Sequence, residues 1–550
     1  MTSTSSPRPT RVRDLIVLLA MLAAALLYLE RVCVSVAEVY IRQDLRIGKM
    51  EMDAAFGAFF IAYALAQVPS GWLSQRYGPR LMMTLYLVGW SVFGIFIAFA
   101  WDFWTLFLAR FLLGLSQAGA YPTAALLLKR WVPDRSRGLA SSIVAFGGRF
   151  GGAGANSLTG ILIVAFVPIS TPAHVAPDQV LSVERFTELL ADAKPAHLVP
   201  IRTRVHAYLV ATDINPERCA EALNRLIRSP GALDSPGSAP IGLSAEGRAI
   251  LAKPASVRTP EESERLNRLI LEKAFPGAVQ ELHGRGWRPT LMIYGIGGVI
   301  VAVLFWLFAR DWPRNHPWCN RAEVDLIESG QSTAGEATAS DAIPWRLLAT
   351  SRNQWLFSAT NIFANIGWIF LITSLPRFLD ERFSVPVERR GLMTTVPLFM
   401  ASFGMIGGGW LTDWLTRRYG RRYGRAVPMG VFKLPCVLAM LICPFLPSAW
   451  AVTAALAVMA VFQDVGVPAV WAFAQDTGGK QVGAVLGWAN MWGNLGAGIA
   501  PSLMGAVTAV GGWDAMLYTG ALAFVLCGLT GMLADASEPL FKDEAHQNAQ

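Results

Sequence analysis

Residues 15–40 read LIVLLAMLAAALLYLERVCVSVAEVY, an apolar stretch with two adjacent charges, Glu30 and Arg31, in its interior. A helix rises about 1.5 Å per residue, so this stretch is long enough to cross roughly 30 Å of hydrocarbon. A charge costs about 3 kcal/mol or more at the bilayer centre, which makes an ionisable residue there a functional candidate by default. We therefore predict a membrane helix with a functional site at Glu30 and Arg31. The alternative is a self-neutralising pair that only faces the interior of a helix bundle.

The composition of the 550-residue chain is that of a membrane protein, with 53% hydrophobic and 16% charged residues and a mean hydropathy of +0.40. Apolar runs of spanning length recur and predict twelve helices in an all-α integral membrane protein. The predicted spans are 15–37, 53–73, 80–100, 103–128, 138–168, 288–309, 354–378, 391–415, 427–447, 449–473, 482–509 and 513–534. Six spans, a break and six more are expected of a transporter built from repeats.

Basic residues in short loops predict the orientation, because Lys and Arg near span ends are retained on the cytoplasmic side. With the N-terminus inside, the inner loops collect Arg76, Arg80, Lys129, Arg130, Arg135, Arg137, Arg310, Arg314, Arg417, Arg418, Arg421, Arg422 and Arg425. We expect a multi-pass protein of the cell (inner) membrane with both termini in the cytoplasm. This retention explains the net charge of +8, and no patch suggests a nucleic-acid partner.

The spans define a predicted domain organisation with one unusual feature, a long polar insert. The predicted parts are a cytoplasmic tail at 1–14, spans one to five at 15–168, an extracytoplasmic insert at 169–286, span six at 287–310, a cytoplasmic linker at 311–353, spans seven to twelve at 354–534, and a cytoplasmic tail at 535–550. In the insert, helical patterns appear at about 182–193, 216–228 and 260–274. Neither the histidines nor the six scattered cysteines have metal-ligand spacing, so no metal and no cofactor is expected.

The loop between the second and third spans contains residues 71–80, GWLSQRYGPR, and residues 409–413, GWLTD, repeat its beginning in the second half. This pattern resembles the major facilitator signature, G-x-L-[AGS]-D-[RK]-[FY]-G-[RK]-[RK]. The resemblance implies the major facilitator fold, with two six-helix bundles and a cytoplasmic gate. The implied gate residues are Gly71, Gln75, Arg76, Gly78, Arg80 and Asp413. Gln75 stands where the family has Asp, so the charge latch of the first half is expected to differ.

Six further stretches resemble the anion:cation symporter family, whose members include hexuronate, galactonate, tartrate, phthalate and vesicular glutamate transporters. YLER at 28–31 is similar to Y-L-D-R, and RFLLG at 110–114 with QAGAYP at 117–122 is similar to R-F-L-L-G-x-x-E-A-x-x-x-P. WVP at 131–133 matches W-[FV]-P, and DTGG at 476–479 with NMWGNLG at 490–496 resembles D-x-G-G and N-x-x-G-N-L-G. The resemblance covers nearly all of the chain except the insert.

This resemblance implies that the substrate carboxylate is held by the first-span arginine, here Arg31, and that acidic groups on spans one and four carry protons. A guanidinium fits a planar carboxylate with a bidentate fork. Glu30 is the expected proton carrier, because a carboxyl group that changes its solvent access can switch between charged and neutral forms. The fourth span departs from the family, since Gln117 replaces the second acid and cannot titrate. Arg110 then either pairs with Glu30 or another group, or adds a second positive charge.

Other polar and aromatic residues within spans fit a hydroxyl-rich substrate, because amides and phenols bond to hydroxyls and a Trp ring offers an apolar face. The full set of expected substrate-binding residues is Tyr28, Arg31, Tyr63, Gln67, Arg110, Gln117, Arg149, Asn361, Asn365, Trp368, Trp471, Asn490 and Asn494. Polar packing between helices is the alternative for each amide. Asp464, which the pattern places near the end of span ten, is expected to be structural.

The sequence predicts a secondary transporter of a small organic anion, such as a hexuronate or hexonate, working by proton symport and alternating access as a monomer in the bilayer. Facilitative anion uniport is one alternative. A membrane receptor or sensor on a transporter scaffold is another, motivated by Gln75, Gln117 and the insert. An enzyme is disfavoured, because the sequence has no nucleotide loop or nucleophile motif.

Overall fold

The computed structural model describes residues 8–167, 245–274, 286–328, 342–383, 387–479 and 481–540, with a few isolated positions besides. The regular elements in these ranges are all helices. The chain divides into two compact units. The first comprises Met1–Cys33, Met50–Asn156 and Leu291–Gln550, and the second comprises Val34–Lys49 and Ser157–Thr290.

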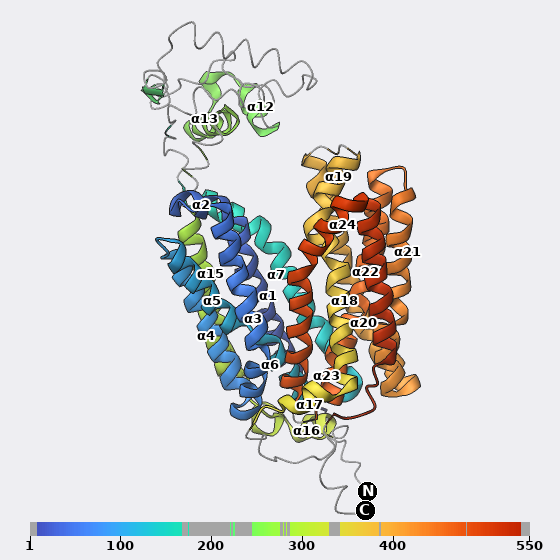
Figure 1. The fold of residues 1–550 in the computed structure, drawn as a ribbon. Coiled ribbons are helices and arrows are strands. Elements are labelled where there is room, and N and C mark those ends of the chain that lie inside the picture. The colour runs from blue at the N-terminus through green and yellow to red at the C-terminus, as the bar shows by residue number, and fades with distance from the viewer. Residues whose placement is uncertain are drawn as a thin grey trace, which may run out of the picture. The chain divides into compact units, whose positions relative to one another are not determined.

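The helices of the first half that belong wholly or mainly to the first unit are called the N-terminal bundle here. They are α1 (Val12–Val36), α3 (Lys49–Tyr77), α4 (Pro79–Ala98), α5 (Phe103–Gln117), α6 (Ala120–Trp131), α7 (Arg137–Ala165) and α15 (Trp287–Phe308). A short 3₁₀ helix, η1 (Asp134–Ser136), joins α6 to α7. These helices run side by side in Figure 1.

The second half forms the C-terminal bundle and the linker that precedes it. The linker contains η5 (Pro313–Asn315), α16 (Arg321–Glu328) and α17 (Trp345–Thr350). The bundle contains α18 (Arg352–Ile369), the π-helical turn η6 (Phe370–Ser374), α19 (Leu375–Phe383), α20 (Val387–Met429), η7 (Val431–Lys433), α21 (Leu434–Ile442), η8 (Cys443–Phe445), α22 (Ala449–Val465), α23 (Val467–Thr477) and α24 (Val482–Leu533).

Eight helices are long and apolar enough to cross a membrane among the described residues. Two of them are double-length, and each turns at a glycine with positive φ, Gly420 in the α20–η8 region and Gly512 in α24. Glycine adopts this conformation without the steric penalty of a Cβ atom. Each double-length helix therefore holds two predicted spans, while α7 and the α18–α19 run occupy the remaining two. The predicted all-α membrane fold is confirmed.

Paired glycines let helices approach closely in both bundles. A Cβ atom added at Gly147 or Gly151 of α7 would lie 2.4 or 2.0 Å from a backbone oxygen of α1. In the C-terminal bundle, Gly404 and Gly408 of α20 stand in the same relation to the backbone of α22, at 2.0 and 2.4 Å. Small residues spaced four apart allow such backbone contact within a membrane. Both bundles thus use the same packing device.

The second unit holds the described part of the insert. It contains α2 (Glu38–Leu45), α12 (Ala245–Leu251), η3 (Ala255–Val257) and α13 (Pro260–Ala274). Ile250, Leu266, Leu269 and Ile270 form a small apolar core between α12 and α13. The helix predicted at 260–274 coincides with α13, whereas the patterns at 182–193 and 216–228 lie mostly outside the described residues.

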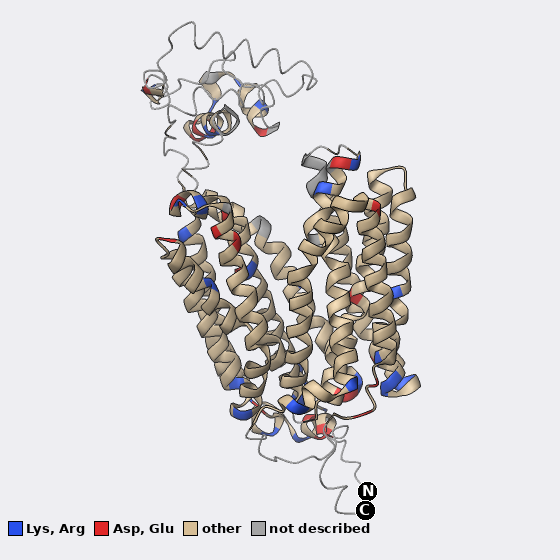
Figure 2. Ribbon diagram, viewed as in Figure 1, with Lys and Arg blue, Asp and Glu red and all other residues tan. Residues whose placement is uncertain are grey.

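Charged side chains are unevenly distributed along the helices of the first unit. Figure 2 shows Lys and Arg gathered where α16 and α17 lie, an end of the unit called the linker end below. The middle of the helices carries few charges in the same view. Those few central charges, which are costly in a membrane, define the candidate site.

Candidate functional site

Arg31 of α1 lies in an aromatic cage. Its guanidinium carbon is 5.0 Å from the ring centroid of Tyr28, 5.0 Å from that of Phe59 and 4.5 Å from that of Tyr63. Arg31 Nε and Nη2 both donate to Gln117 Oε1 at 3.4 Å, and Gln117 Nε2 donates to the carbonyl of Leu27 at 3.3 Å. Gln117 thus fixes the Arg31 side chain through a neutral amide and leaves its charge uncompensated.

Arg110 of α5 shares one of these rings with Arg31. Its guanidinium carbon lies 4.7 Å from the Phe59 centroid and 5.0 Å from that of Phe56. The side chain is 1% exposed, and its Nε and Nη1 atoms have no hydrogen-bond partner among the described residues. The absence of an ion pair at Arg110 among the described residues favours the second of the two predicted possibilities, an added positive charge. Sequence reasoning missed Phe59, which carries no polar signal.

Glu30 points away from Arg31 although the two are neighbours in sequence, because adjacent helical residues lie about 100° apart. A Cβ atom added at Gly94 of α4 would lie 2.9 Å from Glu30 Oε2, and one at Gly298 of α15 would lie 2.9 Å from Oε1. The carboxyl group is therefore enclosed between these helices, where it is 3% exposed. Neither oxygen has a hydrogen-bond partner within the described part of the chain. The predicted alternative of a self-neutralising Glu30–Arg31 pair is wrong.

Arg149 of α7 forms an ion pair with Asp464 of α22, which joins the two bundles. Arg149 Nε lies 3.1 Å from Oδ2 and Nη2 lies 3.0 Å from Oδ1, a bidentate arrangement. Asp464 is fully buried, and Arg149 stacks on Trp368 at 4.5 Å. The sequence pattern placed Asp464 near the end of a span. In the structure α22 and α23 form one continuous span, Ala449–Thr477, so Asp464 lies in its interior.

Tyr121 connects this ion pair to the Arg31 cage. Its ring is 6.3 Å from that of Tyr28 and 5.0 Å from that of Trp471, both edge-on. Gly148 permits the arrangement, because a Cβ atom there would lie 2.6 Å from the Tyr121 hydroxyl and 2.9 Å from the Tyr28 ring. Tyr121 was quoted within a family motif but not predicted as a site residue. Its neighbours could be recognised only in three dimensions.

Most of the predicted amide side chains lie on α18 and α24 of the C-terminal bundle. Asn361, Asn365 and Asn494 each donate from Nδ2 to a carbonyl one turn earlier in their own helix, at 2.7–2.9 Å. Asn361 and Asn365 face Gly493 of α24, since a Cβ there would lie 3.2 and 3.1 Å from their side-chain atoms. Asn490 supplies the carbonyl that Asn494 bonds. Gln67 is fully buried, and its amide has no partner among the described residues.

At the linker end, Asp413 of α20 caps a helix of the opposite bundle. Its Oδ1 accepts from the backbone N–H of Gly138 at 2.8 Å, and Oδ2 accepts from that of Leu139 at 2.9 Å. A carboxylate at a helix N-terminus is stabilised by unpaired N–H groups and by the helix dipole. Gly409, one turn earlier, packs against the start of α7 and permits this approach.

Among the described residues, the matching position of the first half has no such cap. Gly71 of α3 packs on the start of α24, where its Cβ position would lie 2.2 Å from the Gly483 carbonyl oxygen. Gln75, one turn later, is 7% exposed, and neither polar atom of its side chain has a partner among the described residues. The predicted difference at Gln75 is therefore visible as a missing cross-bundle bond.

The basic residues of the signature contact their own bundle. Arg76 lies over the ring of Trp72 at 5.2 Å. Arg80 donates from Nη2 to the Trp306 carbonyl at 2.7 Å, and its backbone N–H donates to Asp311 at 2.9 Å. Gly78 has a φ of +91°, and a Cβ atom added there would lie only 2.8 Å from each carboxylate oxygen of Asp311. Only glycine fits this turn without strain.

Further ion pairs join the two bundles at the linker end. Arg421 of α20 donates to Asp134 of η1 at 2.6 Å, and Arg137 lies 3.8 Å from Asp476 of α23. Asp476 is also bonded by Arg425 at 2.8 Å, and both side chains are buried. Together with the Asp413 cap, these contacts hold the linker ends of the bundles together.

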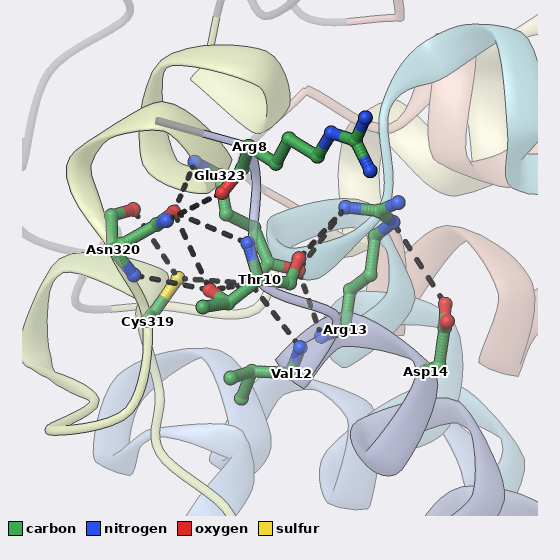
Figure 3. A network of polar contacts seen from close by, with 8 residues as sticks. All are labelled: Arg8, Thr10, Val12, Arg13, Asp14, Cys319, Asn320 and Glu323. Carbon is green, nitrogen blue, oxygen red and sulfur yellow. Dashed lines mark hydrogen bonds and ion pairs between the residues drawn. The ribbon is translucent and has the colours of Figure 1, made fainter. Parts of the chain in front are cut away.

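The linker itself is tied to the start of α1, as Figure 3 shows. Glu323 of α16 is fully buried and accepts from the backbone N–H of Val12 at 3.1 Å and of Arg13 at 3.2 Å. The Arg13 side chain and the Thr10 hydroxyl also donate to it, at 3.1 and 2.5 Å. Glu323 thus caps a helix more than three hundred residues away in sequence.

The family model of the Major Facilitator Superfamily matches residues 20–172 and 276–497. The chain belongs to this superfamily, as its signature sequence predicted. A solved structure of the superfamily transporter FucP in the outward conformation covers 94% of this chain and 98% of its own, with a TM-score of 0.59 and 13% identity. At that identity the likeness shows the fold alone.

Two curated relatives carry the same description, "Probable galactarate/D-glucarate transporter GudP". The one from Pseudomonas putida is 34% identical over 143 residues, which cover 25% of this chain and 31% of the relative. The one from Bacillus subtilis (strain 168) is 23% identical over 540 residues, 95% of this chain and 90% of the relative. The chain thus spans less than a third of the first relative's length and most of the second's. Both fit the predicted anion:cation symporter branch.

Proposed function

We propose that this protein is a secondary transporter that carries a sugar acid across the membrane together with protons. The observation that carries the proposal is the pair Arg31 and Arg110, two guanidinium groups on the Phe59 ring with no acidic partner among the described residues. Uncompensated positive charge in an apolar surrounding favours an anion strongly. The relatives described as galactarate/D-glucarate transporters support a sugar acid as that anion.

Glu30 is the proposed proton carrier. It is enclosed by α4 and α15 without a hydrogen-bond partner for its oxygens among the described residues, a setting in which a carboxyl group favours its neutral form. Opening of the site to water favours the ionised form instead. Proton and anion then bind together, because the proton removes a negative charge from α1 while the substrate adds one beside Arg31.

The substrate's hydroxyl groups are proposed to bind the amides of α18 and α24 and the phenols of Tyr28 and Tyr63. Asn361 and Asn365 face α24, so a polar substrate between the bundles can exchange hydrogen bonds with them. Trp368 and Trp471 supply apolar faces for the sugar carbons. These roles cover the predicted amides of α18 and α24, the phenols and the tryptophans, and they leave Gln67 and Arg149 without one.

Alternating access is the proposed mechanism. The Asp413 cap and the Arg421–Asp134 pair join the bundles at the linker end, and their release would open the site on that side. The concentration of basic residues at the linker end supports a cytoplasmic location for it, with both termini inside the cell and the insert outside. We propose a monomer in the cell (inner) membrane.

A facilitative uniporter is the second candidate, because Gln117 holds Arg31 where the family has a titratable acid. A sensor on a transporter scaffold is the third, motivated by Gln75, whose amide makes no cross-bundle bond among the described residues. Accumulation against a gradient distinguishes symport from uniport, and movement of any substrate distinguishes both from a sensor.

The test uses purified full-length protein in proteoliposomes. We expect counterflow of a radiolabelled sugar acid, such as D-glucarate, and its accumulation when the outside is made acidic. Arg31→Gln should abolish both, whereas an exposed arginine outside the site, as in Arg377→Gln, should change neither. Binding of sugar acids without uptake would favour the sensor, and uptake that equilibrates without accumulating would favour the uniporter.

A further inference from the structure

The Arg149–Asp464 ion pair lies in the interior of the helices, and the proposed function leaves it without a role. Asp464 has no exposed surface, while 28% of the Arg149 side chain is exposed. The pair is bidentate, and it joins α7 of one bundle to α22 of the other. A group that displaces Asp464 from Arg149 would therefore act on the contact between the bundles.

Arg149 belongs to the same cluster as Arg31. Tyr28 lies under the Arg31 guanidinium at 5.0 Å, and the Tyr28 ring also lies 2.9 Å from the Cβ position of Gly148, the residue before Arg149. Tyr28 and Tyr121 both interact electrostatically with each of the two guanidinium groups. Two arginines thus flank one pair of phenols. This arrangement suits a substrate with two carboxylates and with hydroxyls between them.

Asp464 cannot keep its charge at low cost once Arg149 turns to another anion. The other cation that faces it is Lys433 of η7, whose Nζ is already bonded to the Gln463 carbonyl at 2.9 Å and to Gln463 Oε1 at 2.7 Å. A fully buried carboxylate without a cation partner takes up a proton. Arg149 and Lys433 are the charged groups that face Asp464 among the described residues, and the titratable thiol of Cys436 also interacts with it. Tyr28 and Tyr121 face Arg149.

We propose that Arg149 binds the second carboxylate of a dicarboxylic sugar acid and that the displaced Asp464 takes up a proton, which makes this pair a second coupling site. The step exchanges the Arg149–Asp464 contact for an Arg149–substrate contact, and one proton bonds to an Asp464 oxygen. Release of the substrate returns Asp464 to Arg149 and frees the proton. A dianion with protons on Glu30 and Asp464 adds no net charge. This inference rests on the proposed function and supplies the acid that Gln117 removes from span four.

The test measures the number of protons moved per substrate in proteoliposomes, from pH-dye and radiolabel signals recorded together. We expect about two protons per D-glucarate for the unaltered protein and about one for Asp464→Asn. The ratio does not depend on how much of the variant is active. Asp476→Asn removes another buried aspartate from an ion pair and should leave the ratio at about two. An unchanged ratio in Asp464→Asn would overturn the inference.

A second arm tests the role of Arg149 with the double variant Arg149→Gln/Asp464→Asn, which removes both charges and so leaves neither partner buried alone. Counterflow of D-glucarate should fall at least about tenfold more than counterflow of the monocarboxylate D-gluconate, because only the former has a second carboxylate. Equal losses for the two substrates would overturn the assignment. An unaltered protein that carries neither acid would contradict the proposed function instead.

Discussion

At Arg31 a positive charge is fixed in place without a carboxylate partner among the described residues. Gln117 occupies two of its N–H donors, and three aromatic rings stack around its guanidinium group. Cation–π contacts retain the charge while shielding it from lipid. This arrangement keeps the remaining fork of the guanidinium available for a carboxylate. Lysine cannot reproduce it, because its ammonium is a point donor without a planar face.

Arg31→Lys should therefore raise the substrate concentration for half-maximal uptake by roughly ten- to a hundredfold, the effect of one lost bidentate contact of about 1.5–3 kcal/mol. Concentration-dependent counterflow in proteoliposomes measures this change. Arg377→Lys, at an exposed arginine that pairs with Glu381 one turn away, is the matched control. Equal affinities for Arg31→Lys and the unaltered protein would remove Arg31 from the binding site.

A variant of Glu30 should behave differently from one of Arg31, because the proposed role of Glu30 is to carry a proton and not to bind the substrate. Glu30→Gln mimics the protonated acid in shape and hydrogen-bonding groups, so exchange of labelled for unlabelled substrate should continue. Uptake driven by a pH gradient should fall to the level seen without a gradient. Parallel gradient-driven and counterflow assays measure the two. Gradient-driven uptake equal to that of the unaltered protein would exclude Glu30 as the carrier.

At the scale of elements, the two halves differ in how they close the linker end. Asp413 caps α7 from the opposite bundle, whereas Gln75 makes no equivalent bond to α24 among the described residues. Gln75→Asp should add a carboxylate near the α24 N-terminus and stabilise the closed linker end by about 0.5–1 kcal/mol, while Asp413→Asn should weaken it by a similar amount. Spin labels on the exposed Tyr77 and Tyr419 positions report the separation. The prediction fails if the two variants shift the distance distribution in the same direction.

The environment of Cys319, just before the linker helix α16, predicts a slowly reacting thiol. Burial, together with the nearby Glu323 carboxylate 3.6 Å from Sγ, raises the pKa of the Cys319 thiol to about 11. The reactive thiolate is therefore roughly a hundredfold scarcer near pH 8 than for an ordinary cysteine. Maleimide labelling of Cys319, followed by site-specific mass spectrometry, should be slow until the pH approaches 11. Glu323→Gln should speed it at pH 8, and rapid labelling of the unaltered protein at that pH would contradict the assigned environment.

At the scale of the whole molecule, the sequence predicted the membrane helices and the family because both depend on local patterns. Apolar runs identify spans one at a time, and the signature at Gly71 is continuous in sequence. The pairing of Arg149 with Asp464 could not be predicted in this way, since the two residues come from different bundles and lie far apart in the sequence. The orientation of the Glu30 side chain could not be predicted either, because it depends on the space that the missing side chains of Gly94 and Gly298 leave on two other helices. The resemblance identified Arg31 and Arg110, and the apolar pattern placed Arg149 within a span, but only the packing shows that Arg149 has a carboxylate partner.

If anion and proton cross the membrane in one cycle, addition of the substrate alone must move protons. Proteoliposomes that contain the unaltered protein and a pH-sensitive dye are mixed with an unlabelled sugar acid in the absence of any imposed gradient. We predict that the interior acidifies on addition of the substrate and does not acidify in Arg31→Gln vesicles. Substrate entry, measured in parallel with a radiolabel, without any change in internal pH would contradict the account.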